Sequence, residues 1–355
     1  MQITDRADAV RPGEEIDGAA VKEFLQKNIP GLKGDMDVYQ YPGGFSNLTY
    51  LICMGGRKLV LRRPPLGANV KAGHDMGREY RILKAVHTVF PFCPEPLAYS
   101  EDQAVLGAPF FVMEKLSGII LRKDLPEEMV LSESEARTLC IHLVDLFADI
   151  HEIDIDRAGL NSFGKPAGYI RRQVEGWINR YKKAKTPDAP GFEAVTEWLT
   201  DRMPGDTDRP ALIHNDYKFD NVVLDPDCPG KIIGILDWEM ATIGDPLMDL
   251  GSSLAYWVEA EDPEEMQMIR TMPTNMPGAL TRREILDYYE KKTKRSTENF
   301  DFYYCFGLFR LAVIAQQIYY RYYHGITTNK RFAMLIFAVN SLEKTASRVI
   351  ASSHL

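Results

Sequence analysis

The segment HNDYKFDN, residues 214–221, gathers several polar side chains between the apolar runs ALI and VVL. Asp216 could accept a proton, Lys218 could neutralise a negative charge, and Asn221 could offer an amide oxygen to a cation. A polar turn that joins two strands is the plainer interpretation. The rest of the chain has to distinguish a turn from a catalytic segment.

A predicted hairpin brings a second carboxylate to the same place. Residues 222–225 and 231–236 have strand character and are joined by the turn PDCPG. Because a hairpin returns its second strand to the start of the first, Asp237 should lie near Asn221, with Asp216 one loop away. Hard oxygen ligands of this kind suit Mg²⁺, which binds carboxylates together with substrate phosphates.

Phosphoryl transfer requires this combination of residues. One aspartate, here Asp216, orients the attacking hydroxyl and takes its proton, while Asn221 and Asp237 hold the metal that neutralises the phosphates. Lys218 can reach the transferred phosphoryl group as a point charge. The spacing of these four residues favours a catalytic site over a polar turn.

Two regions of different character would position these residues. The first 115 residues contain a helical stretch over residues 19–28, then short runs of strand character with one internal helix over residues 74–89, which predicts a small, mostly antiparallel sheet. After a linker near residues 114–118, helical periodicity dominates. The chain is therefore predicted to be an α+β protein with a β-rich N-terminal lobe over residues 1–115, of which 1–15 are loose, and a larger, mostly helical C-terminal lobe over residues 116–355. Helix starts are predicted near Ser132, Asp262 and Thr281.

The composition limits the class of protein. The 355 residues include 42 Lys+Arg and 50 Asp+Glu, a net charge of -8, which argues against a general nucleic-acid binder. The five cysteines form no CxxC pair, so a reducing compartment is expected. The N-terminus lacks the apolar core of a signal peptide, and Arg310, Gln316 and Gln317 interrupt the most apolar late segment. We therefore expect a cytoplasmic protein without a membrane partner.

From residue 31 or so onward, the chain resembles the aminoglycoside phosphotransferase family, within the protein-kinase-like fold. HNDYKFDN resembles the catalytic loop of that family, ILDWE its metal-binding segment, and GDPLMDLG the stretch that follows. The resemblance implies a bilobal fold with Asp216 as the catalytic base and Asn221 and Asp237 as Mg²⁺ ligands. It also implies that Asp249 braces the catalytic loop through its backbone, the alternative being a helix N-cap.

The N-terminal half carries further expectations. In GGFSNLTY, backbone groups could cover the phosphates of ATP or another nucleoside triphosphate, although the kinase GxGxxG spacing is absent and Gly43-Gly44 also fits a simple hairpin turn. Arg62 stands where kinases carry a lysine, and Glu79 is its candidate partner or else a solvated charge. FFVMEKLSG resembles the hinge between lobes. The residues expected at the nucleotide are Gly43, Gly44, Ser46, Asn47, Arg62, Glu79, Glu114 and Leu116.

The acceptor is expected to be a small molecule, because no stretch after Asp237 resembles the exposed phosphorylation loop of protein kinases. An acidic cluster over residues 259–265 could attract a cationic aminoglycoside, or could only begin a helix. The basic stretch over residues 169–186 resembles that of the phosphotransferase domains fused to acyl-CoA dehydrogenases, which phosphorylate hydroxyacyl-CoA. It could meet CoA phosphates, or could form a solvated helix face.

The leading hypothesis is an ATP- and Mg²⁺-dependent phosphotransferase that acts on the hydroxyl of a small molecule, such as a hydroxyacyl-CoA or another metabolite. The alternatives are a non-catalytic nucleotide-binding regulatory module, an aminoglycoside-modifying kinase, and a metal-dependent hydrolase that uses His214, Asp216 and Asp237. His214 is expected to shape the loop by hydrogen bonding, and Tyr217, Phe219 and Trp238 to be packing residues. Glu239 has no assigned role.

Overall fold

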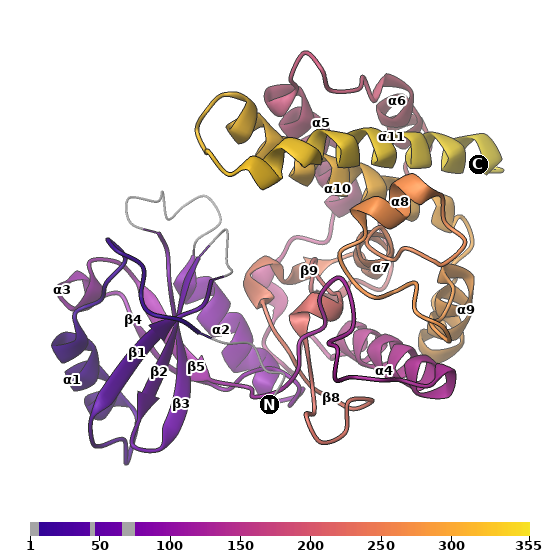
Figure 1. Cartoon of the computed structure of the whole chain (residues 1–355). Coiled ribbons are helices and arrows are strands. Elements are labelled where there is room, and N and C mark those ends of the chain that lie inside the picture. Colours follow the sequence, from indigo (N-terminus) through magenta and orange to yellow (C-terminus); the bar gives the residue numbers. More distant parts are fainter. Residues whose placement is uncertain (1–6, 43–46, 66–74) are drawn as a thin grey trace. The chain divides into compact units, whose positions relative to one another are not determined.

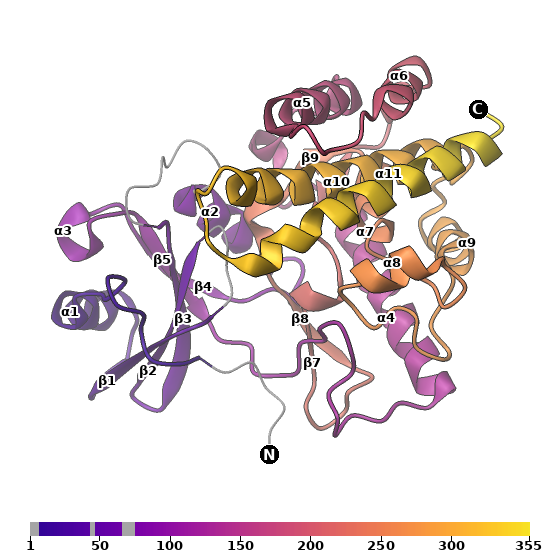
Figure 2. The same ribbon diagram turned by 45° about the horizontal axis from the view of Figure 1, so that its top comes forward.

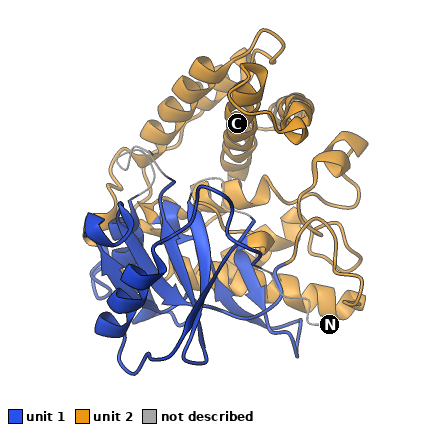
Figure 3. Ribbon diagram, turned by 60° about the vertical axis from the view of Figure 1, so that its left-hand side comes forward, with its two compact units in different colours: residues 1–120, 156–160, 221–241 blue, residues 121–155, 161–220, 242–355 orange. Residues whose placement is uncertain are grey.

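The computed structural model describes residues 7–42, 47–65 and 75–355. The chain forms two compact units (Figure 3). The first unit comprises residues 1–120, 156–160 and 221–241, and the second comprises residues 121–155, 161–220 and 242–355. The first unit therefore includes a late segment of the chain. The predicted division of roles between residues 1–115 and 116–355 stays a prediction.

The first unit is built on a five-stranded antiparallel sheet (Figure 1). Its strands lie in the order β1-β2-β3-β5-β4. The bounds are β1 Met36–Gln40, β2 Leu48–Met54, β3 Arg57–Arg63, β4 Pro96–Ser100 and β5 Phe110–Glu114. The predicted antiparallel N-terminal sheet is confirmed.

Alternating side chains and a tight turn explain the centre of this sheet. Along β2 every second residue is buried, as expected of a strand with one face on a core. Gly55 and Gly56 have φ values of 58° and 75°, the backbone that a two-residue hairpin turn requires and that glycine adopts without strain. Helix α1, Gly18–Asn28, begins at the N-cap Asp17 and contributes Val21 and Leu25 to the same core as Tyr50 and Ile52.

Two more helices belong to the first unit. α2, Met76–His87, begins at Asp75, whose side chain accepts a hydrogen bond from the Arg78 amide at 2.8 Å. α3, Gln103–Leu106, is a single turn. The prediction of one internal helix is thus confirmed for α2, whereas the short α3 was missed.

A hairpin from late in the sequence is attached to the first unit. β7, Val222–Leu224, pairs antiparallel with β8, Ile232–Ile235. Backbone hydrogen bonds join Leu224 to Ile119 in both directions, at 2.8 and 2.9 Å, and the Ile235 amide donates to Phe92 at 2.6 Å. A Cβ atom at Gly118 would come within 2.1 Å of the Leu224 carbonyl oxygen, so the close approach of this segment to β7 requires glycine.

The second unit is mostly helical. Two of its long helices, α10 and α11, lie side by side (Figures 1 and 2). β6 Ala211–Ile213 pairs antiparallel with β9 Thr242–Gly244, and the HNDYKFDN segment begins directly after β6. The helices are α4 Glu133–His151, α5 Tyr169–Ala184, α6 Glu193–Asp201, α7 Pro246–Leu254, α8 Glu264–Ile269, α9 Arg282–Thr293, α10 Phe300–Tyr323 and α11 Leu335–Ser352. Over both units, the described residues form 3₁₀ turns at η1 Asn161–Phe163, η2 Phe219–Asn221, η3 Trp238–Met240 and η4 Lys330–Met334.

Capping residues and buried polar groups explain these helices. The helix starts predicted near Ser132 and Thr281 are confirmed, and each is a capping box, formed by Ser132 with Glu135 at α4 and by Thr281 with Glu284 at α9. α10 is apolar because it is the buried centre of the unit, and its Gln316 donates to Ala184 and Thr186 at 2.9 and 3.0 Å. Within the described residues, no helix has the length and apolar character needed to cross a membrane.

Candidate active site

Asp249 holds the start of the HNDYKFDN segment by its backbone. Its two carboxylate oxygens accept hydrogen bonds from the amides of His214 at 2.7 Å and Asn215 at 2.8 Å. The predicted bracing role is confirmed. The N-cap of α7 is Asp245 instead, so the alternative interpretation of Asp249 was wrong.

A buried network supports Asp249 in turn. His151 Nε2 lies 3.2 Å from Asp249 Oδ2, and its Nδ1 lies 2.7 Å from the Tyr289 hydroxyl. On the other side of the loop, Arg310 of α10 donates to the Asn215 carbonyl at 2.7 Å. Asn215 has a φ of 65°, a conformation that asparagine tolerates better than most residues. The loop backbone is therefore held both through its amides and through a carbonyl.

Within the loop, Lys218 and Asp216 are in direct contact. Lys218 Nζ lies 2.5 Å from Asp216 Oδ1 and 3.5 Å from Asp220 Oδ1, and it faces the ring of Tyr256 at 4.9 Å. Burial disfavours the charged ammonium, but Tyr256 and the two carboxylates outweigh it and raise the pKa of Lys218. The lysine is therefore a cation next to the predicted base.

Aromatic residues of the loop fix it to the helices. Tyr217 stacks on Phe147 at a ring distance of 4.2 Å and donates its hydroxyl hydrogen bond to the Leu143 carbonyl at 2.7 Å. Phe219 is buried and stacks on Trp257 at 5.6 Å. His214 Nδ1 accepts from the Asp216 amide at 3.2 Å. The expected structural roles of these loop residues are confirmed.

In the first unit, Arg62 gathers three carboxylates. Nη1 contacts Glu79 at short range and lies 3.1 Å from Asp237, while Nη2 lies 3.2 Å from Glu239. Arg62 itself is 8% exposed. Burial disfavours its charge, but the three carboxylates outweigh burial and raise the pKa of the guanidinium above its ordinary value.

Glu79 of α2 is the partner of Arg62, as predicted. It is 2% exposed, so the alternative of a solvated helix charge was wrong. Desolvation by burial, together with the neighbouring Asp237 and Glu239, raises the pKa of Glu79 above its ordinary value, and the attraction of Arg62 offsets part of this shift. The role of the pair toward a nucleotide stays a prediction.

Asn221 and Asp237 lie at the same end of the hairpin. The Leu236 amide donates to the Asn221 carbonyl at 2.8 Å, which places the residue before Asp237 directly beside Asn221. Asp237 has a φ of 66° and a side chain that is 35% exposed. Trp238 is buried and donates to Ile235 at 2.9 Å, which confirms it as a packing residue.

The two oxygen-bearing side chains fit Mg²⁺ by their chemistry, since this ion prefers one or two protein carboxylate or carbonyl oxygens and keeps water and phosphate oxygens for the rest. The described residues contain no group of three or more His, Cys, Asp or Glu that could hold a metal ion.

The remaining nucleotide-site residues are less defined. Gly43, Gly44 and Ser46 lie outside the described residues. The Glu114 amide donates to the Glu95 carbonyl at 2.9 Å and is therefore used within the sheet, whereas Leu116 packs its side chain against Gly234. Asn47 is buried and contacts Glu239, a residue to which no role was assigned.

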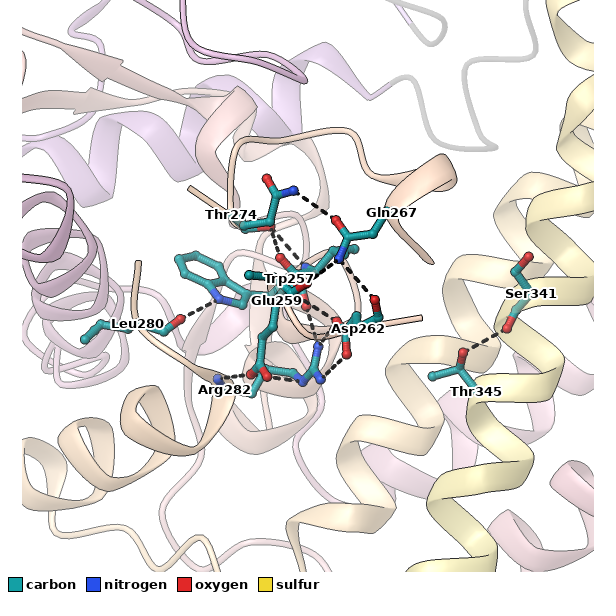
Figure 4. Close-up of polar contacts among 12 residues, drawn as sticks. Trp257, Glu259, Asp262, Gln267, Thr274, Leu280, Arg282, Ser341 and Thr345 are labelled. Carbon is teal, nitrogen blue, oxygen red and sulfur yellow. Dashed lines mark hydrogen bonds and ion pairs between the residues drawn. The ribbon is translucent and has the colours of Figure 1, made fainter. Parts of the chain in front are cut away.

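The acidic cluster over residues 259–265 contacts arginine side chains, and Figure 4 shows Glu259 and Asp262 around Arg282. Arg282 lies 2.6 Å from Asp262 and 3.4 Å from Glu259, and Arg348 lies 2.7 Å from Glu265. α8 begins within the cluster, as predicted. The internal ion pairs favour the structural interpretation of this cluster over attraction of a cationic substrate.

Several positive charges of α5 also have local contacts. Arg171 pairs with Glu175 at 3.8 Å, and Arg180 lies over the Trp177 ring at 4.7 Å. Arg172 donates to backbone carbonyls at short range. Lys182 and Lys183 are exposed. The predicted contact with CoA phosphates stays a prediction.

An antiparallel five-stranded sheet followed in the chain by a mostly helical unit is the arrangement of kinase-like phosphotransferase structures, and the chain has this fold. Residues 37–283, more than half of the chain, match the model of the phosphotransferase enzyme family, and the chain belongs to that family. This confirms the family to which the sequence pointed.

Known relatives agree with this assignment. The chain is 30% identical to acyl-CoA dehydrogenase family member 11 of Rattus norvegicus, over 97% of this chain and 44% of the relative, and 32% identical to its counterpart in Gallus gallus, over 92% and 42%. The chain thus spans less than half the length of these relatives. A solved structure assigned as an aminoglycoside phosphotransferase of Ralstonia eutropha has a TM-score of 0.82 at 26% identity, covering 96% of this chain and 100% of that one.

More distant structures share the fold. A complex of GDP and kanamycin with APH(2")-IIia has a TM-score of 0.59 at 15% identity, covering 94% of this chain and 99% of that one.

Proposed function

We propose that this phosphotransferase moves the γ-phosphoryl group of ATP to a hydroxyl of a small molecule, with Mg²⁺. The observation that carries the proposal is the contact of Arg62 with both Glu79 and Asp237. Through these contacts, the guanidinium of Arg62 connects β3, α2 and the end of the β7–β8 hairpin. Kinase-like sites position a nucleotide and its metal with such a strand cation, helix glutamate and metal-binding aspartate.

Asp216 accepts the proton of the acceptor hydroxyl in this proposal. The acceptor oxygen forms a new bond to the γ-phosphorus as the bond from that phosphorus to the bridging oxygen of ADP breaks. Lys218, 2.5 Å from Asp216, offsets negative charge on the transferred group. Asn221 and Asp237 would hold Mg²⁺, which when bound neutralises phosphate charge. Arg62 contributes a fixed positive charge to the α- and β-phosphates.

Hydroxyacyl-CoA thioesters are the first acceptors to test. The similarity of the chain to part of the acyl-CoA dehydrogenase family members supports this choice. The exposed Lys182 and Lys183 also support it, because their positive charges could contact CoA phosphates. Aminoglycosides are the weaker choice, because the acidic residues that could attract them pair with Arg282 and Arg348.

The experiment measures ADP release and phosphorylated product across hydroxyacyl-CoA, other hydroxylated metabolites and aminoglycosides, with Mg²⁺ and ATP. We expect one acceptor class to give product, and Asp216→Asn and Asp237→Asn to remove it. Product formation that is equal in the wild type and both variants would refute the proposal. Nucleotide binding without product from any acceptor would favour a regulatory module.

A further inference from the structure

Glu239 makes contacts that the predicted catalytic roles do not explain. Its Oε2 accepts a hydrogen bond from Asn47 Nδ2 at 2.6 Å and lies 3.2 Å from Arg62 Nη2. Its backbone carbonyl accepts from Arg78 Nη1 at 3.3 Å. All of these residues belong to the first unit. Both the side chain and the backbone of Glu239 are therefore held in place.

The two terminal nitrogens of Arg62 face different partners. Nη1 contacts Glu79 and Asp237, whereas Nη2 contacts Glu239. A guanidinium is a planar fork, and its usefulness toward a phosphate depends on the direction of that plane. Contacts at Nη1 alone would leave the plane free to turn, and the contact at Nη2 supplies a second fixed point.

The sign of the charge makes this arrangement informative. The carboxylate of Glu239 stands beside a residue assigned to anionic phosphates, where a negative charge by itself would repel the nucleotide. The presence of Glu239 is explained if the nucleotide affinity gained by orienting Arg62 exceeds the affinity lost to this repulsion. A lysine at position 62 would present a point charge and would need no such orientation.

We propose that Glu239 is a positioning residue, which orients the Arg62 guanidinium toward the phosphates of a nucleoside triphosphate, and that Asn47 holds Glu239 in that position. This inference rests on the proposed function, because it takes Arg62 as a phosphate contact.

The test measures ATP affinity by isothermal titration calorimetry, once with EDTA and once with Mg²⁺. Glu239→Ala should weaken ATP binding about tenfold or more under both conditions, since it removes a charge-assisted contact of Arg62. Glu239→Gln should weaken it less, because an amide oxygen can still accept from both Asn47 and Arg62. Asp37→Asn, which removes an exposed charge from β1 of the same unit, is the matched control and should bind ATP as the wild type does.

A double-mutant cycle separates action through Arg62 from direct action. In an Arg62→Ala background, Glu239→Ala should change ATP affinity by less than about twofold. Additive losses would overturn the inference, as would tighter ATP binding by Glu239→Ala, which plain electrostatic repulsion predicts. A loss of affinity seen only with Mg²⁺ would make Glu239 a metal ligand and would also overturn the inference.

If Glu239→Ala does not fold, Asn47→Ala gives the same test, because it releases the Glu239 side chain and leaves its charge. An ATP affinity of Asn47→Ala unchanged from the wild type would then count against the inference. A wild type that binds no ATP would refute the proposed function itself, whereas a wild type that binds ATP beside an unaffected Glu239→Ala would refute only this inference.

Discussion

The brace at Asp249 gives the sharpest stability prediction. Asp249 is 0% exposed and accepts the amide hydrogen bonds of His214 and Asn215 through different oxygens. In Asp249→Asn one oxygen remains, so one of the two backbone amides faces an NH₂ group and loses its acceptor. A hydrogen bond to a charged group contributes about 1.5–3 kcal/mol, and a buried donor without an acceptor costs about 1–3 kcal/mol. We therefore expect the variant to lose about 2–3 kcal/mol of unfolding free energy.

Asp245→Asn is the matched control, because it makes the same chemical change four residues earlier. Asp245 is also buried, and its side chain accepts from the amides of Leu247 and Met248 as the N-cap of α7. Asparagine caps helices as well as aspartate does, so we expect a change below about 0.5 kcal/mol.

The assay combines urea unfolding, followed by circular dichroism, with hydrogen exchange of the His214 and Asn215 amides in the native state. Asp249→Asn should lower the unfolding free energy and should speed exchange at one or both amides. The brace would be refuted if Asp249→Asn and Asp245→Asn had equal stability and left exchange at both amides unchanged.

Two further predictions concern packing and reactivity. Tyr217→Phe should cost about 1 kcal/mol of unfolding free energy, because it removes the hydrogen bond to Leu143 and keeps the stacking on Phe147. Tyr217→Ala, which removes the ring as well, should cost about 3–5 kcal/mol. Thermal and urea unfolding measure both costs, and equal costs would contradict the packing role. A thiol reagent at pH 8 should label Cys228 first, since it is the exposed thiol, and rapid labelling of a buried one by mass spectrometry would contradict this. Burial raises the pKa of the Cys140 thiol to about 11 and of the Cys93 and Cys305 thiols to about 12. These thiols therefore stay protonated and react slowly with the reagent until the pH approaches those values.

Local signals in the sequence were enough to predict the parts of the site formed by neighbouring segments. The limits of β2 follow from alternating side chains and from the two glycines that end the strand. The closeness of Asn221 to Asp237 follows from one hairpin, and the Leu236 amide bears it out. In each case the contact depends on a turn whose residues can be recognised in the sequence.

Contacts between distant segments could not be predicted in this way. Asn47 and Glu239 are 192 residues apart, and no local pattern indicates which two segments meet or in which register. The pairing of β6 with β9 joins two runs of three residues, too short for periodicity to reveal. Glu239 therefore had no assigned role, although it lies two residues after a predicted metal ligand.

Single-turnover transfer of labelled phosphate from [γ-³²P]ATP tests the central claim most directly. With an accepted substrate and saturating enzyme, Asp216→Asn should slow transfer by about 10²–10⁴-fold, the usual contribution of a general base, while ATP affinity changes little. Transfer at the wild-type rate by Asp216→Asn would contradict the account.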